Sequence, residues 1–333
     1  MTQPVLHIIS HTDLDGVAAA ALAWHCAQSG GKLVKVSLTG YGDVDELIIN
    51  TLRLGDEPLV LDLFCQREQT IDEIDRTWDN SRQPFLFDHH RSTFERYANR
   101  GWACVDVSYC GALVYWRWLA QNYPTGIVRE VLKKLEPLVR IANDRDLWLG
   151  ELPDSRLWQG LLSLCGHWSA FTRLAVNPSA DLTREERRGA EEYVERQESR
   201  FAAAKKLVVR SGDDLAFLRD GVLEFGDVSD FCGLILDREP CQPLVAAVSA
   251  KRMGGDWAVS LRSRDGFAGR VMALLKDGKK VRGGGHGDAS ALYFPRGYTE
   301  DQIRESILAA IKVQKERDES PSVTLGDLFK GLV

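Results

Sequence analysis

The chain has 333 residues, of which 44% are hydrophobic, so its length and apolar content favour two domains with cores of their own. Its net charge of −6 argues against a protein that wraps long duplex nucleic acid, because such proteins usually carry a basic surface. The charge is uneven, since positions 251–282 hold nine Lys or Arg against three Asp, and this basic segment suits a small anion.

Seven cysteines are scattered along the chain without a C-x-x-C pair, which indicates reduced thiols and a cytoplasmic protein rather than a disulfide framework. The first ten residues lack the basic segment of a secretory signal, and no stretch of about 18 uncharged apolar residues is present. We therefore expect neither secretion nor a membrane span.

The first half of the chain alternates short apolar runs with helical stretches. Strands are predicted over 5–10, 32–38, 58–64, 84–90 and 103–108, and helices over 16–29, 44–54 and 67–80. Strands rich in Val, Leu and Ile, separated by amphipathic helices, indicate a mostly parallel sheet covered on both faces. We predict a doubly wound α/β domain over residues 1–180.

A strongly charged segment follows from about 177 to 200 and has no turn signal before Ser211, so it predicts a connecting helix, assigned to 181–210. Beyond it, predicted strands over 243–251 and 256–263 flank a Gly-Gly hairpin signal, and a helix is predicted over 267–275. These elements predict a smaller α/β domain over 211–315, followed by a polar tail over 316–333.

Polar residues stand where predicted strands end, which is where sites form in open α/β sheets. The segment S-H-T-D-L-D-G at 10–16 places three acidic or imidazole side chains within five residues. An acid interrupts the apolar run LVLDLF, the motif D-H-H closes the strand 84–90, and an acidic turn follows a helical stretch that ends near 140. The candidate metal ligands in these four clusters are His11, Asp13, Asp15, Asp62, His89 and Asp144.

Each cluster taken alone has an ordinary structural alternative. Asp15 can be a helix N-cap, since Asp is favoured at that position. Asp62 can be a buried carboxylate satisfied by protein donors, the D-H-H motif can be a surface turn, and Asp144 can belong to an internally paired turn. Only the combination of the four clusters favours a metal centre.

The combined donors are carboxylates and imidazoles without thiolates. This set suits divalent cations, with Mn²⁺ favoured by the imidazoles and Mg²⁺ or Co²⁺ as alternatives. Two cations about 3.5–4 Å apart can activate a water and neutralise the charge of an in-line phosphoryl displacement. Asp62 is the candidate for the carboxylate that bridges the two ions.

Features suited to anion binding occur in the second predicted domain. In R-G-G-G-H at 282–286, consecutive glycines let backbone N–H groups approach an anion, and His286 can donate to a phosphate oxygen. The alternative for this run is a flexible loop before the strand ASALYF. Arg262 and Arg264 share one face of a predicted strand, where they can hold a phosphate or provide solubilising surface charge.

In this order the motifs resemble those of the DHH phosphoesterases with a DHH-associated C-terminal domain, such as nano-RNases (oligoribonucleases) and nucleoside-bisphosphate phosphatases. The resemblance rests on 10–16, on Asp62 in V-L-D-L, on D-H-H at 88–90, on Asp144, and on V-S-L-R-S with G-G-G-H (259–263 and 283–286). It spans positions 10 to 290, nearly the whole chain. It implies a metal-dependent hydrolase that acts on phosphoester bonds.

The resemblance also implies roles for individual residues. His11 and Asp13 would ligate one cation, and Asp15, His89 and Asp144 the other, with Asp62 bridging them. The implied catalytic residues are Asp62, Asp88, His89 and His90, of which His90 would lie near the scissile phosphate. The implied substrate-binding residues are His90, Arg262, Ser263, Gly283, Gly284, Gly285 and His286.

The sequence departs from the family pattern at two motifs. The fourth motif reads N-D-R-D-L-W where many members have Asp-Thr, so Asp146 remains an alternative to Asp144 as a ligand. The glycine run has Arg282 where another glycine is common, which bears on substrate preference more than on catalysis.

We therefore expect an enzyme that hydrolyses the phosphodiester bonds of short oligonucleotides or linear dinucleotides, as an exonuclease or oligoribonuclease does, or that removes phosphate from a nucleoside bisphosphate. An inorganic pyrophosphatase or polyphosphatase of the same superfamily is the enzymatic alternative, and a nucleotide-binding module without turnover is the other. Long duplex nucleic acid and membranes are not expected as partners. The sequence leaves open the substrate length, the base preference, the cleavage polarity, the opening of cyclic dinucleotides and the formation of a homodimer.

Overall fold

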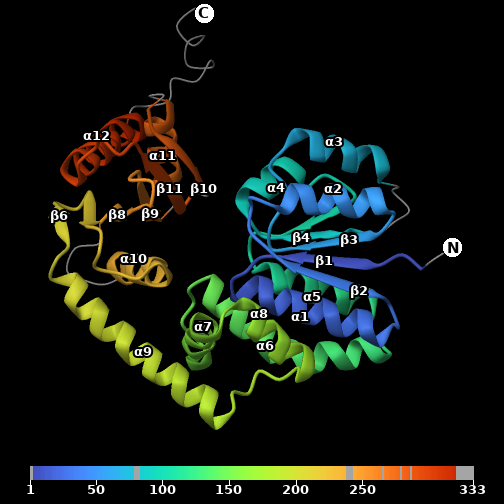
Figure 1. The fold of residues 1–333 in the computed structure, drawn as a ribbon. Helices are drawn as coiled ribbons and strands as arrows, with labels where there is room; N and C mark the ends of the chain where they lie inside the picture. Colours follow the sequence, from blue (N-terminus) through green and yellow to red (C-terminus); the bar gives the residue numbers. More distant parts are fainter. Residues whose placement is uncertain are drawn as a thin grey trace, which may run out of the picture. The chain divides into compact units, whose positions relative to one another are not determined.

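The computed structural model describes residues 3–78, 83–237, 243–264, 266–277, 280–285 and 287–319. The chain divides into two compact units, unit 1 (Met1–Arg196) and unit 2 (Gln197–Val333), and the division falls inside helix α9 (Arg184–Lys205) (Figure 1). The predicted domain boundaries at 180, 210 and 315 stay predictions. Among the residues that the structure describes, none of the helices has the length and apolarity that a membrane crossing requires.

Unit 1 is built on a sheet of five parallel strands, which confirms the predicted fold class. The strands are β1 (Leu6–Ser10), β2 (Val34–Leu38), β3 (Glu57–Leu61), β4 (Leu86–Asp88) and β5 (Ala103–Val105), in the order β2-β1-β3-β4-β5. Because all five strands run in one direction, their carboxyl ends lie at the same edge of the sheet, here called the carboxyl edge. The residues that follow each strand therefore meet there.

Successive side chains of a strand point to opposite faces of this sheet, and each face packs against a core of its own. Ile8 packs among residues of α1 (Leu14–Ser29), α5 (Gly111–Asn122) and α6 (Ile127–Asp146), whereas Ile9 packs against α2 (Val44–Leu54), α3 (Glu68–Thr77) and α4 (Arg91–Tyr97). Both side chains are fully buried, and burial of each stabilises the fold by about 1.5–3 kcal/mol. Helices α7 (Pro153–Cys165) and α8 (His167–Val176) complete the first core.

The predicted elements of unit 1 are found with shifted ends. Helix α1 begins at Leu14 rather than at Gly16, because the Asp13 side chain caps it by accepting a hydrogen bond from the Gly16 N–H at 2.9 Å. Helix α3 ends at Thr77, and residues 79–82 lie outside the described residues. Between 111 and 176 the sequence pattern predicts only a helical stretch ending near 140. The structure has four helices there, α5 to α8, and they form much of the first core.

Unit 2 contains a mixed sheet of six strands in the order β10-β11-β9-β8-β7-β6. Its strands are β6 (Val209–Ser211), β7 (Leu215–Leu218), β8 (Val245–Lys251), β9 (Trp257–Ser263), β10 (Arg282–Gly285) and β11 (Ala289–Phe294). Its helices are η1 (Phe225–Asp227), α10 (Val228–Asp237), α11 (Phe267–Asp277) and α12 (Glu300–Glu319). Strands β8 and β9 pair antiparallel as the predicted hairpin.

Two segments of unit 2 have a defined secondary structure. The glycine run is not the loop given as the alternative for it, because Gly283–Gly285 pair antiparallel with β11. A Cβ at Gly283 would lie 3.0 Å from the Ala291 carbonyl oxygen, so the close pairing requires glycine there. The beginning of the predicted polar tail, 316–319, belongs to α12, and residues 320–333 lie outside the described residues.

Candidate active site

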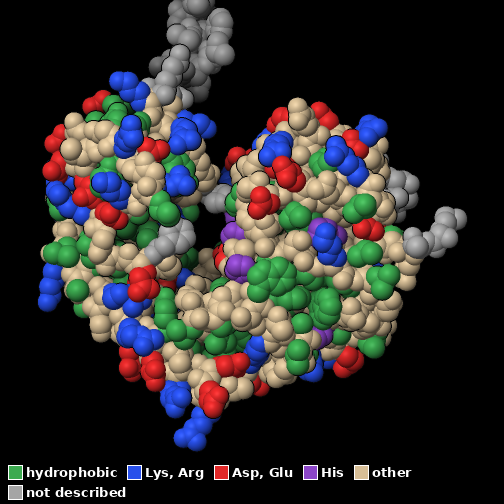
Figure 2. All heavy atoms as spheres, viewed as in Figure 1, with side chains coloured by type: hydrophobic (Ala, Val, Ile, Leu, Met, Phe, Trp, Pro, Cys, Tyr) green, Lys and Arg blue, Asp and Glu red, His purple; other side chains and the backbone are tan. Residues whose placement is uncertain are grey.

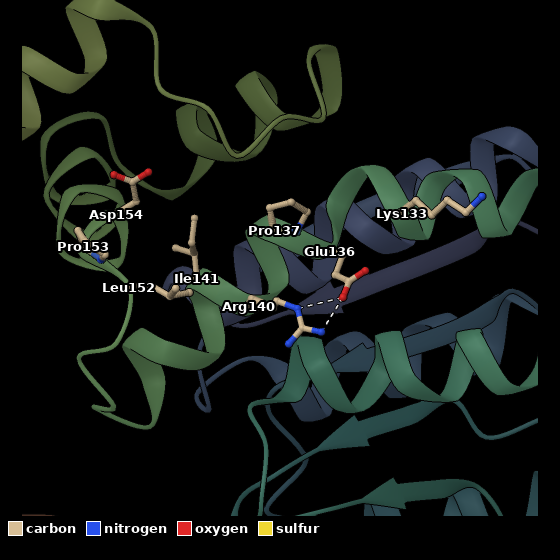
Figure 3. Close-up of a pocket in the computed structure, with 8 residues that line it drawn as sticks. All are labelled: Lys133, Glu136, Pro137, Arg140, Ile141, Leu152, Pro153 and Asp154. Atoms are coloured by element: carbon tan, nitrogen blue, oxygen red, sulfur yellow. Dashed lines mark hydrogen bonds and ion pairs between the residues drawn. The ribbon is translucent and has the colours of Figure 1, made fainter.

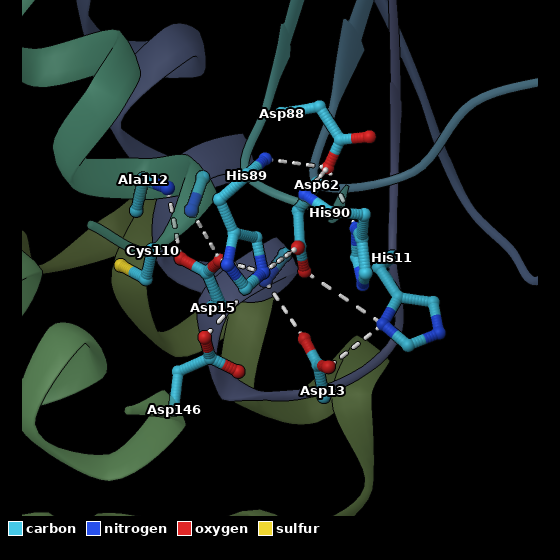
Figure 4. A network of polar contacts seen from close by, with 12 residues as sticks. His11, Asp13, Asp15, Asp62, Asp88, His89, His90, Cys110, Ala112 and Asp146 are labelled. Carbon is cyan, nitrogen blue, oxygen red and sulfur yellow. Dashed lines mark hydrogen bonds and ion pairs between the residues drawn. The ribbon is translucent and has the colours of Figure 1, made fainter. Parts of the chain in front are cut away.

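The carboxyl edge of the unit 1 sheet gathers acidic and imidazole side chains from distant parts of the chain. They follow β1, β3 and β4, and one further residue comes from the end of α6. Figure 4 shows these side chains turned towards one another. The residues that form the cluster are His11, Asp13, Asp15, Asp62, Asp88, His89, His90 and Asp146.

The loop after β1 is folded by its own polar groups. The Asp13 carboxylate caps α1 through one oxygen and lies 2.7 Å from Nδ1 of His11 through the other. The Ser10 hydroxyl donates to the Gly16 carbonyl oxygen at 2.7 Å. A Cβ on Gly16 would lie only 2.4 Å from the His11 carbonyl oxygen, so the tight turn needs glycine. The turn brings His11 and Asp13 to the same side of the loop.

Asp62 follows β3 in a left-handed backbone conformation, with φ of +59°. Such a conformation costs a non-glycine residue about 1–3 kcal/mol and recurs at functional sites. The Asp62 N–H donates to the Phe87 carbonyl oxygen, so the strand pairing continues into this residue. The strained backbone turns its fully buried side chain into the cluster instead of along the strand.

Asp15 is held by the N-terminus of α5. The N–H groups of Gly111 and Ala112 donate to its two carboxylate oxygens at 2.6 and 2.8 Å. Helix N-termini favour negative charge, so this helix stabilises a buried carboxylate. A Cβ on Gly111 would lie 2.9 Å from Cβ of Asp62 and 3.2 Å from the Asp15 carboxylate. Gly111 therefore determines how closely two cluster residues approach, and the sequence patterns did not identify it.

The side chains form three overlapping groups of potential ligands, each with its ligand atoms within 4.8 Å of one another. The first group is His11, Asp13 and Asp62, and the second is Asp15, His89 and Asp146. The third group, Asp62, Asp88, His89 and His90, shares one residue with each of the others. Nε2 of His89 lies 3.3 Å from Oδ1 of Asp62, so these two residues join the groups. It also lies 3.4 Å from Oδ2 of Asp146 and 4.0 Å from Oδ2 of Asp15.

The two acids of the fourth motif lie in different surroundings, and which of them binds a cation stays a prediction. Asp144 belongs to none of these groups, and its Oδ1 accepts hydrogen bonds from the N–H groups of Glu151 and Leu152, at 2.7 and 3.2 Å. The Asp146 carboxylate belongs to the second group. Residues two apart on a helix point to nearly opposite sides, so only one of the two can face the cluster.

Asp88 belongs to the third group and also holds His90. Its Oδ1 accepts hydrogen bonds from Nδ1 of His90 at 2.7 Å and from the His89 N–H at 2.8 Å. Burial by itself would lower the pKa of His90, but the adjacent Asp88 carboxylate raises that pKa to about 9. Near neutral pH the His90 ring is therefore positively charged and oriented by Asp88.

Tyr41 is a member of the site that the sequence patterns did not identify. Its hydroxyl lies 3.4 Å from Nε2 of His90, and its ring lies 6.0 Å from the ring of His11. Tyr41 follows β2 at the carboxyl edge, so the rule that pointed to the other residues applies to it as well. It was not identified because a single tyrosine is not part of any metal-binding sequence pattern.

The electrostatics of the cluster are those of a cation site. Burial, and then the neighbouring carboxylates led by Asp15, raise the pKa of Asp62 well above its ordinary value. Burial likewise raises the pKa of Asp146 to about 7, against the opposing effect of His89. Among the residues that the structure describes, Oδ2 of Asp62, Asp88 and Asp146 are buried without a hydrogen-bond partner, and so is Oδ2 of Asp144, which lies in none of the three groups. Positive charge would satisfy these oxygens, so the residues fit divalent cations.

The cluster is not closed off within unit 1. The side chain of His11 is 26% exposed and that of Asp13 is 44% exposed, whereas that of Asp62 is only 2% exposed. Histidine side chains are visible at the surface of unit 1 beside acidic ones (Figure 2). A small ligand can therefore approach the first group of ligands while the joining carboxylate stays buried.

The residues expected to bind substrate in unit 2 have partners of their own. Arg262 donates to the Ser229 hydroxyl at 2.7 Å and to the Leu261 carbonyl oxygen, and burial lowers its pKa. The Ser263 hydroxyl accepts from the Ala268 N–H at the start of α11. Gly283–Gly285 form β10, and His286 lies outside the described residues. Their role in substrate binding stays a prediction.

Comparison with known proteins identifies the fold. No protein-family model matches the sequence, and no curated protein does. The solved structure of exonuclease RecJ bound to manganese has a TM-score of 0.58 at 14% identity and covers 97% of this chain and 93% of its own. RecJ from Thermus thermophilus in complex with Mn²⁺ has a TM-score of 0.54 at 16% identity and covers 92% of this chain and 52% of its own.

CDC45 from Entamoeba histolytica has a TM-score of 0.55 at 8% identity and covers 93% of this chain and 95% of its own. At these identities the similarity establishes the fold alone. The chain thus has a fold shared by proteins named as an exonuclease and by one whose name states no reaction. Its activity must be argued from the site.

Proposed function

We propose that this chain is a metal-dependent phosphoesterase of the DHH type. It hydrolyses the phosphodiester bonds of short oligonucleotides or linear dinucleotides, or removes phosphate from a nucleoside bisphosphate. The observation that carries the proposal is the convergence of three overlapping ligand groups, linked through Asp62 and His89, with buried carboxylate oxygens that lack partners. Such an arrangement is costly without cations and serves little structural purpose.

The two groups of three residues would hold two divalent cations, and Mn²⁺ is the ion that we expect. His11, Asp13 and Asp62 would hold one, and Asp15, His89 and Asp146 the other, with Asp62 shared. Bound in this way, the cations supply an activated water and neutralise charge on the phosphoryl group. The nitrogen and oxygen donor set is typical of Mn²⁺ sites, and RecJ is named as bound to manganese.

The remaining residues of the site act on the substrate. Asp88 fixes the Nδ1 side of His90, so Nε2, which the Tyr41 hydroxyl contacts, is the nitrogen turned away from this carboxylate. The Asp88 carboxylate favours the positively charged form of His90, which would favour a phosphate over a neutral group. Tyr41 limits the rotation of this ring by its hydroxyl contact with Nε2. We assign to these residues the orientation of the scissile phosphate.

The substrate is short. The net charge of −6 argues against a long polyanion as substrate, and the basic segment 251–282 belongs to unit 2. We assign the binding of the substrate's terminal phosphate or nucleotide to Arg262, Ser263, the strand Gly283–Gly285 and His286. The name of RecJ, an exonuclease, agrees with a nucleic-acid end as substrate.

A product-resolved assay tests the proposal. Protein stripped of metal and then supplied with Mn²⁺, Mg²⁺ or Co²⁺ is incubated with dinucleotides, longer RNA, 3′-phosphoadenosine 5′-phosphate and pyrophosphate. We expect Mn²⁺-dependent cleavage of the short nucleotides. Preferential release of phosphate from pyrophosphate would instead favour a pyrophosphatase, and binding without turnover would favour a nucleotide-binding module.

The decisive variant is Asp62→Asn. Asn tolerates a left-handed backbone, so this change removes the charge of Asp62 while keeping its shape. We expect activity to fall by about three orders of magnitude. The matched control is Asp45→Asn, a buried carboxylate outside the site that accepts from the N–H groups of Gln66 and Arg67. Equal activity of Asp62→Asn and wild type would end the catalytic assignment.

A further inference from the structure

The end of helix α6 meets the metal-binding cluster through more than one side chain. Asp146, its last residue, lies 3.4 Å from Nε2 of His89 through Oδ2. Asn143 stands three residues earlier, so the side chains of Asn143 and Asp146 are neighbours on the helix surface. Oδ1 of Asn143 accepts a hydrogen bond from the N–H group of Cys110 at 3.0 Å. Asn143 thus connects the end of α6 to the beginning of α5, 33 positions away in the sequence.

The beginning of α5 is capped by residues of other helices. The first N–H groups of a helix have no acceptor within that helix and need one from elsewhere. Cys110 occupies the N-cap position, and its side chain makes no capping hydrogen bond. Its N–H group donates to Asn143 instead. The N–H groups of Gly111 and Ala112 donate to the carboxylate of Asp15. Asn143 and Asp15 together therefore hold the first residues of α5.

The beginning of α5 has little freedom to move without disturbing Asp15. Cys110 is fully buried and Asp15 is 2% exposed, so water cannot readily replace a lost acceptor. Without the oxygen of Asn143, the Cys110 N–H would be a buried donor without a partner, and α5 would have to shift or turn to reach another acceptor. Either change would displace the two N–H groups that orient the Asp15 carboxylate.

The polar residues one turn earlier on α6 make a different set of contacts. Arg140 donates to Glu136 at 2.6 and 2.9 Å. Both residues border a cavity of about 460 Å³ that lies between α6 and the start of α7 (Figure 3). Their side chains are paired with each other rather than with α5. This part of the helix therefore provides a control that does not involve the cluster.

From these contacts we propose that Asn143 is a positioning residue for the second group of ligands, Asp15, His89 and Asp146. It fixes the beginning of α5, which orients the Asp15 carboxylate, while Asp146 on the same helix end lies beside His89. One helix end thus supplies one carboxylate of the group and fixes the place of the other. The inference rests on the proposed function, in which this group holds a cation.

Calorimetric titration of the full-length, metal-stripped protein with Mn²⁺ tests the proposal. Asn143→Leu removes the acceptor from a side chain that is branched in the same way, and Asn143→Asp keeps an oxygen acceptor there. We expect Asn143→Leu to weaken the binding of one of two Mn²⁺ ions about 10- to 100-fold, and Asn143→Asp to restore it. Arg140→Leu, the control one turn earlier, should leave both affinities unchanged.

Hydrogen exchange of the metal-free proteins gives a readout that needs no bound ion. The amides of residues 110–112 should exchange at least about tenfold faster in Asn143→Leu than in the wild type, while those of β1 stay unchanged. This pattern separates a local effect on α5 from a general loss of stability. Asn143→Ala, which removes the acceptor without adding bulk, replaces Asn143→Leu if thermal melting shows that the latter is not folded.

Three results would overturn the proposal. They are unchanged Mn²⁺ affinity in Asn143→Leu, an equal loss for both ions that Asn143→Asp does not restore, and unchanged exchange at residues 110–112. If the wild type binds no Mn²⁺, the proposed function fails, and the exchange at residues 110–112 alone decides whether Asn143 holds α5. A failure of the proposed function and a failure of this inference are therefore distinguishable.

Discussion

Two histidines of the same sheet show how differently its two ends treat charge. His90, at the carboxyl edge, has a pKa raised to about 9, whereas His7, within β1, has a pKa lowered to about 4. His7 is 3% exposed and lies between the hydroxyls of Thr51 and Ser37, at 2.6 and 2.8 Å, and the Asp56 carboxylate is the weakest of the three influences on its pKa. His90 has Asp88 at 2.7 Å.

The difference follows from the geometry of a parallel α/β sheet. The helices that follow the strands begin at the carboxyl edge, so their N-termini stabilise carboxylates there, as α5 does for Asp15. Those carboxylates in turn stabilise cations and charged histidines. Within β1, burial favours the neutral form of His7. Charge chemistry is therefore confined to one edge, and the predictions below test that confinement.

Among the variants that test this confinement, the largest effect is expected for Gly111→Ala. The added Cβ would lie 2.9 Å from Cβ of Asp62, so the carboxylate cluster must widen. We expect the free energy of unfolding to fall by about 1–3 kcal/mol, as measured by urea unfolding. We expect activity to fall about 100-fold, as measured by turnover. The control is Gly189→Ala in α9, where the new Cβ would meet only a Leu164 methyl, at 3.7 Å. We expect this change to leave the free energy of unfolding unchanged or to raise it slightly.

The second prediction concerns the neutral histidine. His7 binds its proton in the unfolded chain near pH 6.5 but in the folded protein only near pH 4, because burial, then Lys35, lowers its pKa against the opposite effect of Asp56. Its contribution to stability is complete above pH 6.5 and is lost as the pH falls towards 4, by about 3 kcal/mol. His7→Gln should remove this part of the pH dependence in urea unfolding from pH 7.5 to 4.5. An unchanged pH profile would show that His7 does not titrate as described.

The third prediction separates the two acids at the end of α6. Asp146→Asn should weaken Mn²⁺ binding about 10- to 100-fold in calorimetric titration, because it removes a ligand of the second group. Asp144→Asn should leave Mn²⁺ affinity intact and lower the free energy of unfolding by about 1 kcal/mol, through weaker bonds to the loop at 151–152. The reverse pattern would restore Asp144 as the ligand.

The smallest effect is expected for Tyr41→Phe. The phenylalanine ring keeps the packing beside His11, but the hydroxyl that contacts His90 is lost. We expect kcat to fall about three- to tenfold with Mn²⁺ affinity unchanged, as measured by steady-state kinetics and metal titration. A change in Mn²⁺ affinity instead would place Tyr41 with the metal ligands rather than with His90.

Much of unit 1 could be predicted from local pattern. The five strands and the first helices follow from apolar periodicity, and the position of Asp62 and of the D-H-H motif after strands follows from where those strands stop. The glycine run in unit 2 could not be assigned in this way. Its strand character depends on pairing with β11, a partner that becomes available only through the fold.

By itself, the sequence determined the α/β architecture and most of the candidate ligands, because hydrophobic period and strand ends are local properties. Only the tertiary structure decided that Asp146 faces the cluster and Asp144 does not, that Gly111 and α5 hold Asp15, and that Tyr41 reaches His90. The reason is physical. The rotation of a helix about its axis and the approach of residues almost a hundred positions apart are determined by packing, which no short stretch of sequence contains.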